Sequence, residues 1–181
     1  MTSSQTLHPM REIRVEKVTL NIGAGKDQNV LEKGVKLLKN LTGRVPVKTL
    51  TQKRIAAWGL RPGLPIGCMV TLRKDKAVDL LSRTLDAKDY QLDKDQFDDQ
   101  GNLSFGVPEY IDIRDAKYDP EIGVLGLQVS VTLERPGFRI KKRRLQQKKI
   151  PPKHRITKEE AIEFMRSRFK VKFESEQEGE K

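Results

Sequence analysis

The stretch "IGCMVTLRK", residues 66–74, shows the most regular alternation of side-chain polarity in the chain. One phase is apolar and consists of Ile66, Cys68, Val70 and Leu72. The other phase consists of Met69, Thr71 and Arg73. Successive side chains of a strand point to opposite faces, so the alternation predicts a strand with one buried and one solvent-facing side. The same phase predicts that Cys68 is a buried structural thiol.

A second stretch, "IRVEKVTLNIGAG" at residues 13–25, repeats this pattern. Its apolar phase consists of Val18, Leu20 and Ile22, and its polar phase consists of Lys17, Thr19 and Asn21. If this strand lies beside residues 66–74, the two polar phases form one patch rich in hydrogen-bond donors. An ordinary solvent-exposed sheet face is the alternative interpretation.

Shorter alternations predict further strands at residues 45–50, 101–107 and 126–134, and an edge strand at 171–173. A helical period predicts helices at residues 27–43 and 76–87, and a last helix that opens at Thr157 with Glu160 completing a capping box. We therefore predict one α+β domain over residues 1–181. Its sheet is mostly antiparallel, with helices packed on one face and a polar surface on the other.

The charges are segregated along the chain. Residues 33–74 and 135–158 hold 21 of the 36 Lys and Arg residues and no Asp or Glu, whereas the rest of the chain holds 15 basic and 25 acidic residues. Solubility alone does not need this segregation. Two acid-free segments produce a local positive field that concentrates a polyanion, and nucleic acid is the commonest such partner. An anionic membrane surface is the rival partner.

Several other classes of protein lack support in the sequence. No apolar run approaches the roughly 20 residues that cross a membrane, and the N-terminus has no apolar signal-peptide core. A single cysteine cannot form an internal disulfide, which indicates a reducing, cytoplasmic setting. His8 and His154 have no partners at metal-ligand spacing, and Lys26 in "NIGAGKDQ" precedes Asp27 where a phosphate-binding loop needs Ser or Thr. We therefore expect no metal, cofactor, membrane or small-molecule substrate.

Two basic segments are predicted to lie outside the sheet. Residues 51–65 hold two glycines and two prolines, which predicts an exposed loop; it carries Lys53, Arg54 and Arg61 around Trp58, the only tryptophan. The Trp58 ring is interpreted either as an anchor beneath the loop or as a platform for a nucleotide.

Residues 135–158 contain "KKRR" at 141–144, few apolar residues and two adjacent prolines. This composition favours an extended basic arm that an external polyanion fixes. The acidic residues 174–181 are expected to form a solvated, frayed tail.

Three segments resemble a known family: "VTLNIGAG" at 18–25, "LTGRVPVKTLTQKRIAAWGLRPGLPIGCMVTLR" at 41–73 and "GNLSFGVPEYIDI" at 101–113. They are similar to the universal 5S-rRNA-binding protein of the large ribosomal subunit, large-subunit protein five, called L-eleven in eukaryotes. The resemblance runs from about Pro9 to Phe169. "RPGFRI" followed by "IPPKHRITKEEA" resembles the archaeal and eukaryotic form.

The resemblance implies an α+β fold whose antiparallel sheet binds 5S rRNA, with Lys17, Asn21 and Thr71 in the contacting cluster. The family commonly has Gln where the cationic Arg44 stands, so the hydrogen-bond role of that Gln is not carried over to Arg44, and a phosphate contact is the expectation for this position. The loop at 52–63 resembles the one that reaches toward P-site tRNA. The implied partners are 5S rRNA, large-subunit rRNA, P-site tRNA and neighbouring ribosomal proteins, including a head protein of the small subunit.

The polar phases, the basic segments and the resemblance together give two sets of expected contact residues. The rRNA-contacting set is Lys17, Thr19, Asn21, Arg44, Lys48, Thr71, Arg73, Arg139, Lys141, Lys142, Arg143 and Arg144. The tRNA-contacting set is Lys53, Arg54, Trp58 and Arg61. We expect a structural constituent of the large ribosomal subunit in the central protuberance that performs no chemistry. A basic enzyme acting on nucleic acid, with an unrecognised metal site, and a peripheral membrane protein are the alternatives.

Overall fold

The computed structural model describes residues 8–173. Five strands form one antiparallel sheet in the order β2-β3-β1-β6-β5. They are β1 (Arg14–Gly23), β2 (Val47–Leu50), β3 (Pro65–Arg73), β5 (Leu103–Val107) and β6 (Leu127–Glu134). The edge strand expected at 171–173 is β7 (Lys172–Phe173), which pairs with β4 (Gln91–Leu92) in a separate, parallel, two-stranded sheet. The predicted acidic tail at 174–181 lies outside the described residues.

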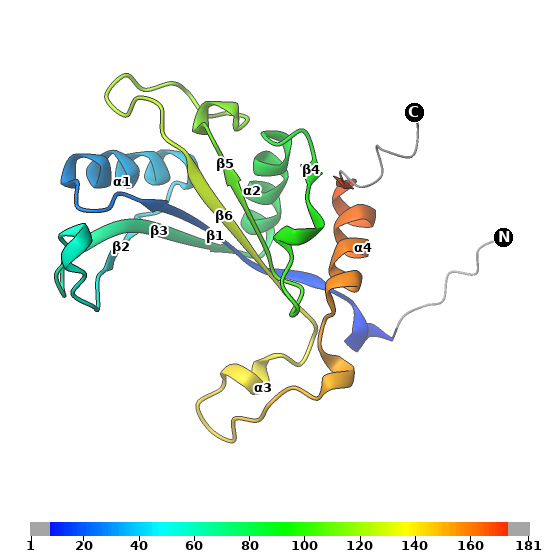
Figure 1. Cartoon of the computed structure of the whole chain (residues 1–181). Helices are drawn as coiled ribbons and strands as arrows, with labels where there is room; N and C mark the ends of the chain where they lie inside the picture. Colours follow the sequence, from blue (N-terminus) through cyan, green and yellow to red (C-terminus); the bar gives the residue numbers. More distant parts are fainter. Residues whose placement is uncertain (1–7, 174–181) are drawn as a thin grey trace.

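The first two α-helices of the chain cover one face of the five-stranded sheet, as predicted (Figure 1). The α-helices are α1 (Gln28–Thr42), α2 (Asp75–Asp86), α3 (Arg139–Lys142) and α4 (Lys158–Phe169). Short 3-10 turns are η1 (Pro9–Arg11), η2 (Ala56–Trp58), η3 (Lys94–Gln96), η4 (Tyr110–Asp112) and η5 (Pro152–His154). The fold is therefore α+β, with the acid-free segments contributing β2, β3 and the connections around them.

The alternation of the strands produces the core. Leu20 of β1 lies opposite Val70 of β3 and Val129 of β6, and all three side chains are buried. The predicted inward phases of β1 and β3 are otherwise buried too, except that Ile66 at the start of β3 is half-buried. Cys68 is fully buried in the same cluster, as expected. Removal of these apolar side chains from water is the main favourable term that holds helices and sheet together.

The predicted helix ends are also confirmed. The Asp27 side chain accepts a hydrogen bond of 2.9 Å from the backbone N–H of Asn29, and Gly43 ends α1 in the left-handed region at φ 65°. Thr157 and Glu160 form the expected capping box at the start of α4. These caps satisfy backbone groups that a helix end leaves without intrahelical partners.

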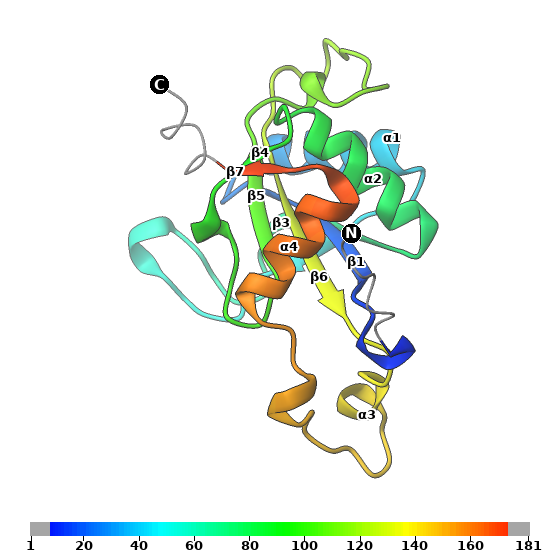
Figure 2. The ribbon, with the colours of Figure 1, turned by 90° about the vertical axis from the view of Figure 1, so that its right-hand side faces the viewer.

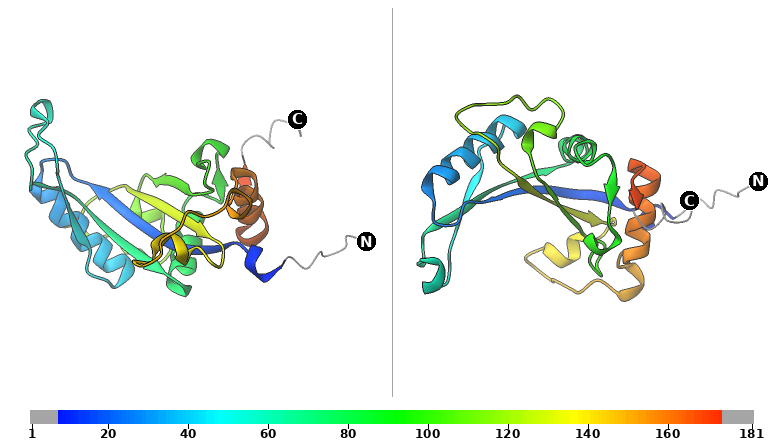
Figure 3. Two further views of the ribbon diagram at one scale, coloured as in Figure 1. Left: turned by 90° about the horizontal axis from the view of Figure 1, so that it is seen from below. Right: turned by 45° about the horizontal axis from the view of Figure 1, so that its top comes forward.

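The face of the sheet opposite α1 and α2 carries the polar phases of the strands and is called the open face. The loop at 51–65 (the basic loop) and the segment at 135–158 (the basic arm) both extend to this side of the sheet (Figure 1), away from α1 and α2 (Figure 2). Seen from below, the basic arm crosses in front of the strands, while the basic loop projects from the far end of the sheet (Figure 3). The basic loop and the basic arm thus flank one surface.

Candidate nucleic-acid interface

The centre of the open face is built from β1 and β3, which are direct neighbours. Lys17 lies opposite Arg73, and Thr19 lies opposite Thr71. The hydroxyl oxygens of Thr19 and Thr71 are 3.3 Å apart, within hydrogen-bond distance. Asn21 lies opposite Met69, whose side chain is 38% exposed and interrupts the polar surface. The patch that the two alternations predicted is therefore assembled by the fold.

Strands β6 and β5 extend this patch with residues that the sequence reasoning missed. Thr132 lies opposite Lys17, Ser130 opposite Thr19, and Gln128 opposite Asn21. Ser104 of β5 lies opposite Ser130, with their hydroxyl oxygens 2.8 Å apart. The signal was present in "GLQVSVTLE", because the residues between its inward side chains are polar. Only the position of β6 beside β1 assigns them to the same surface.

Two expected contact residues lie away from the open face. Lys48 of β2 lies opposite Cys68, whose side chain points into the core, so the register places Lys48 on the helix-covered side of the sheet edge. Burial raises the pKa of the Cys68 thiol, and the nearby Lys48 ammonium opposes that rise. Arg44 follows Gly43 at the end of α1, where its backbone N–H donates to the Thr42 hydroxyl over 3.3 Å. The fold brings neither residue into the row of Lys17 and Arg73.

The basic loop is a hairpin connection between β2 and β3 that projects into solvent. The backbone N–H of Thr51 donates to the carbonyl of Leu64 over 2.9 Å, and Ile55 and Leu60 form a bridge near the tip. Trp58 is 68% exposed, so its ring is not buried beneath the loop and is available as a stacking surface. The three expected cations of the loop, Lys53, Arg54 and Arg61, are exposed as well.

The basic arm contains the single helical turn α3. Arg139, Lys141 and Arg144 are exposed, whereas Arg143 is half-buried and donates from Nε to the carbonyl of Gln146 over 2.9 Å. Lys142 is exposed too, with its side chain 48% exposed, but its ammonium also contacts the sheet.

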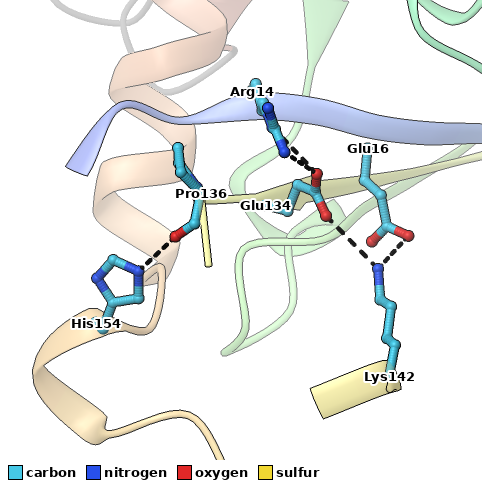
Figure 4. A network of polar contacts seen from close by, with 6 residues as sticks. All are labelled: Arg14, Glu16, Glu134, Pro136, Lys142 and His154. Carbon is cyan, nitrogen blue, oxygen red and sulfur yellow. Dashed lines mark hydrogen bonds and ion pairs between the residues drawn. The ribbon is translucent and has the colours of Figure 1, made fainter. Parts of the chain in front are cut away.

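Figure 4 shows this contact as a small ionic network at the end of β1 and β6. The Lys142 ammonium pairs with the carboxylate of Glu16 and lies 3.6 Å from that of Glu134. Arg14 donates to the same Glu134 carboxylate at 2.8 Å. The root of the arm is therefore held against the sheet by two carboxylates, which use the charge of Lys142 within the protein.

A second set of contacts closes the neck of the arm. Arg135 is 5% exposed, and its guanidinium donates to the carboxylate of Glu160 at 2.7 Å and to the carbonyl of Arg155 at 3.1 Å. The His154 ring lies 3.0 Å from the carbonyl of Pro136 (Figure 4) and packs edge-on against the ring of Phe138. Both ends of the arm are thus joined, and the basic residues between them lie on a closed loop.

Two alternative functions were a basic enzyme acting on nucleic acid with a metal site and a peripheral membrane protein. Among residues 8–173, no group of three or more His, Cys, Asp or Glu side chains is arranged to hold a metal ion. None of the helices in that part of the chain has the length and apolarity to cross a membrane.

Comparison with known proteins gives matches over nearly the whole chain. Residues 8–61 match the family described as Ribosomal protein L5, and residues 65–164 match the C-terminus of the same ribosomal family. The large ribosomal subunit protein uL5 of Nanoarchaeum equitans is 51% identical over 158 residues, which cover 87% of this chain and 93% of that protein. The uL5 of Sulfurisphaera tokodaii is 46% identical over 172 residues, covering 94% of this chain and 97% of the relative. The uL5 of Methanobrevibacter smithii is 44% identical over 170 residues, which cover 94% of this chain and 100% of that protein.

Proposed function

The chain belongs to the ribosomal L5 family of large-subunit proteins, and on this basis we propose that it binds 5S rRNA through the open face of its sheet. The archaeal relatives agree with the form of the family that the ending of the sequence predicted. As a large-subunit ribosomal protein it assembles with rRNA and other ribosomal proteins. The proposal adds which RNA it binds and by which surface.

One observation carries the assignment of the surface. The open face has the polar residues of four strands at its centre and a basic segment on each side, and it lies opposite the helices. Cations supply the sequence-independent attraction for phosphate, and uncharged donors and acceptors supply contacts that depend on geometry. A surface with both, in this arrangement, suits a large folded RNA.

The proposal is tested by binding of the purified protein to 5S rRNA. Asn21→Ala and Thr71→Ala should each weaken binding by about fivefold, because each removes a hydrogen-bonding group worth on the order of 1 kcal/mol and no core packing. Circular dichroism and thermal unfolding of both variants should match the wild type. Native folding with unchanged affinity in both variants would refute the assignment of the open face.

We assign the basic loop a different partner, P-site tRNA, following the family resemblance of residues 52–63. The exposed Trp58 ring, the three exposed cations and the projection of the loop away from the sheet centre support this assignment. Neighbouring ribosomal proteins, among them the head protein of the small subunit, are the remaining proposed partners.

The family consists of structural constituents of the ribosome, and we propose that this chain likewise performs no chemistry, holding 5S rRNA in the central protuberance. Calorimetric titration with Mg²⁺ and Zn²⁺ tests the alternative of a metal-dependent enzyme. A stoichiometric metal site on the free protein would support that alternative.

A further inference from the structure

The middle of the open face is a continuous row of hydroxyl groups across four strands. In the order of the sheet it consists of Thr71, Thr19, Ser130 and Ser104, each directly opposite the next. Neighbouring strands are about 4.8 Å apart, so the row spans roughly 14 Å. Ser104 is exposed and the other three are half-buried, so the whole row is reachable from solvent. We call it the hydroxyl row.

The hydroxyl row keeps unused hydrogen-bonding capacity. Its members form two pairs, Thr19 with Thr71 at 3.3 Å and Ser104 with Ser130 at 2.8 Å. A hydroxyl has one hydrogen to donate and two lone pairs to accept with. Each pair therefore retains one free hydrogen and at least two free lone pairs, because the Gln128 amide uses one further lone pair by donating to Ser104 at 3.5 Å. The row can both donate to a ligand and accept from it.

The neighbouring rows differ in chemistry. On one side lie the cations Lys17 and Arg73 with Thr132, and on the other lie the amides Asn21 and Gln128. Gly106, opposite Gln128, has open space where a side chain would stand, so the surface stays low at that point. Charge is thus confined to one border of the face, and its centre is neutral.

We propose that the hydroxyl row recognises ribose 2′-hydroxyl groups of the bound RNA, an inference that rests on the proposed function. A phosphate oxygen can only accept hydrogen bonds and would leave the lone pairs of the row unmatched. A 2′-hydroxyl both donates and accepts, as the row does. The minor groove of A-form RNA is wide and shallow and displays these groups, so it can meet a broad face with short side chains. The row makes the protein selective for RNA over DNA and leaves phosphate neutralisation to the surrounding cations.

A double-mutant cycle between protein and RNA tests this contact directly. The protein variant combines Thr71→Val with Ser130→Ala, one change in each pair; valine keeps the shape and strand preference of threonine. The RNA probe is the 5S rRNA with 2′-deoxy nucleotides at the positions that the protein protects in footprinting. We expect the protein variant and the deoxy RNA each to lower affinity by about tenfold or more, at about fivefold per contact. The affinity of the protein variant for the deoxy RNA should be little lower than with either change alone, because both changes remove the same contacts.

Two controls separate this role from general weakening. Ser167→Ala removes an exposed hydroxyl on α4, outside the open face. It should change the affinity neither for unmodified 5S rRNA nor for the 2′-deoxy RNA. Arg73→Gln should weaken the binding of both RNAs equally and lower the slope of log affinity against log salt by about one. The hydroxyl variant should leave that slope unchanged, because it removes no phosphate contact.

The outcomes are distinct. If wild-type protein binds 5S rRNA but the losses from protein and RNA changes multiply, the hydroxyl row does not contact the 2′-hydroxyls and this inference fails alone. An unchanged affinity of the hydroxyl variant has the same consequence. If the wild-type protein does not bind 5S rRNA at all, the proposed function fails and this inference fails with it.

Discussion

Replacing Arg135 by methionine should destabilise the protein more than replacing Arg14 by methionine. Both arginines donate to a carboxylate over nearly equal distances, 2.7 Å to Glu160 and 2.8 Å to Glu134. They differ in burial, because the Arg135 side chain is 6% exposed and the Arg14 side chain is 60% exposed. The comparison therefore contrasts a buried and an exposed ion pair of similar length, and Arg135 differs further in its hydrogen bond to the Arg155 carbonyl.

The expected magnitude follows from the contacts that Arg135 makes. Loss of a hydrogen bond to a charged group costs about 1.5–3 kcal/mol, and loss of the bond to the Arg155 carbonyl costs about 1 kcal/mol. Two features reduce the total. Glu160 is 41% exposed, so water screens the pair, and Nε of Arg135 is buried with no hydrogen-bond partner in the described structure, an unfavourable feature that methionine removes. A net loss of about 1–3 kcal/mol remains, against about 0–1 kcal/mol for the exposed Arg14 pair.

Thermal and urea unfolding of the two variants measure this difference. For a chain of this size, 1 kcal/mol lowers the midpoint temperature by about 2–4 °C. Arg135→Met should therefore lower it by several degrees, and Arg14→Met by a few degrees at most. Equal shifts in the two variants would show that burial does not set the strength of these pairs, and the reasoning would be wrong.

The pH dependence gives a second measurement of the same contact. Burial acts to raise the pKa of Glu160, but hydrogen bonds from the Thr157 N–H and the Arg135 guanidinium outweigh it, and the net pKa lies below the ordinary value of 4.5. A lowered pKa in the folded state contributes stability that is complete above the ordinary value and is lost as the pH falls through the folded value. The difference in stability between wild type and Arg135→Met should shrink below about pH 4.5. A difference that grows with acid would contradict this assignment.

Three further predictions concern the basic segments. Replacing Lys53, Arg54 and Arg61 together by alanine should leave binding to isolated 5S rRNA nearly unchanged and weaken tRNA binding on assembled ribosomes; a collapse of 5S affinity would place the loop in the 5S interface. Amides across residues 141–149 should exchange fast in the free protein and slowly in the subunit, because rRNA phosphates supply the counter-charge; equal protection in both states, measured by mass spectrometry, would refute this. Reversing the charges of Arg143 and Arg144 should flatten the salt dependence of RNA affinity by about one unit of slope per lost phosphate contact.

The local features of the fold were predictable because they depend on neighbouring residues. Alternation in residues 18–22 and 66–72 assigned nearly every inward and outward side chain, since the period of a strand is fixed by its geometry. The caps at Asp27, Gly43 and Thr157 were predictable for the same reason, because a cap involves residues only a few positions apart.

The composition of the open face was only partly predictable, because it depends on strand order and register. Nothing local in "GLQVSVTLE" indicates that β6 lies beside β1, so Ser130 and Thr132 were not among the expected contacts. Lys48 was expected on the RNA side, but its register against β3 places it opposite the buried Cys68. A shift of one residue in a strand moves a side chain to the other face, and only the pairing of β2 with β3 fixes that shift. The contact of Lys142 with Glu16 joins distant parts of the chain and is not visible in the sequence.

The acidic residues near the open face refine the argument from charge. The acid-free segments explain why the basic loop and most of the arm present only positive charge, yet Glu16 and Glu134 lie where the arm meets the sheet. Both carboxylates are paired, with Lys142 and Arg14, so they reduce the positive field at the root of the arm without presenting free negative charge to RNA. We therefore expect Lys142, although 48% exposed, to position the arm, and the phosphate contacts of the arm to be made mainly by other exposed cations such as Arg139, Lys141 and Arg144. Counting basic residues in the segment therefore overstates the number of phosphates that the arm can neutralise.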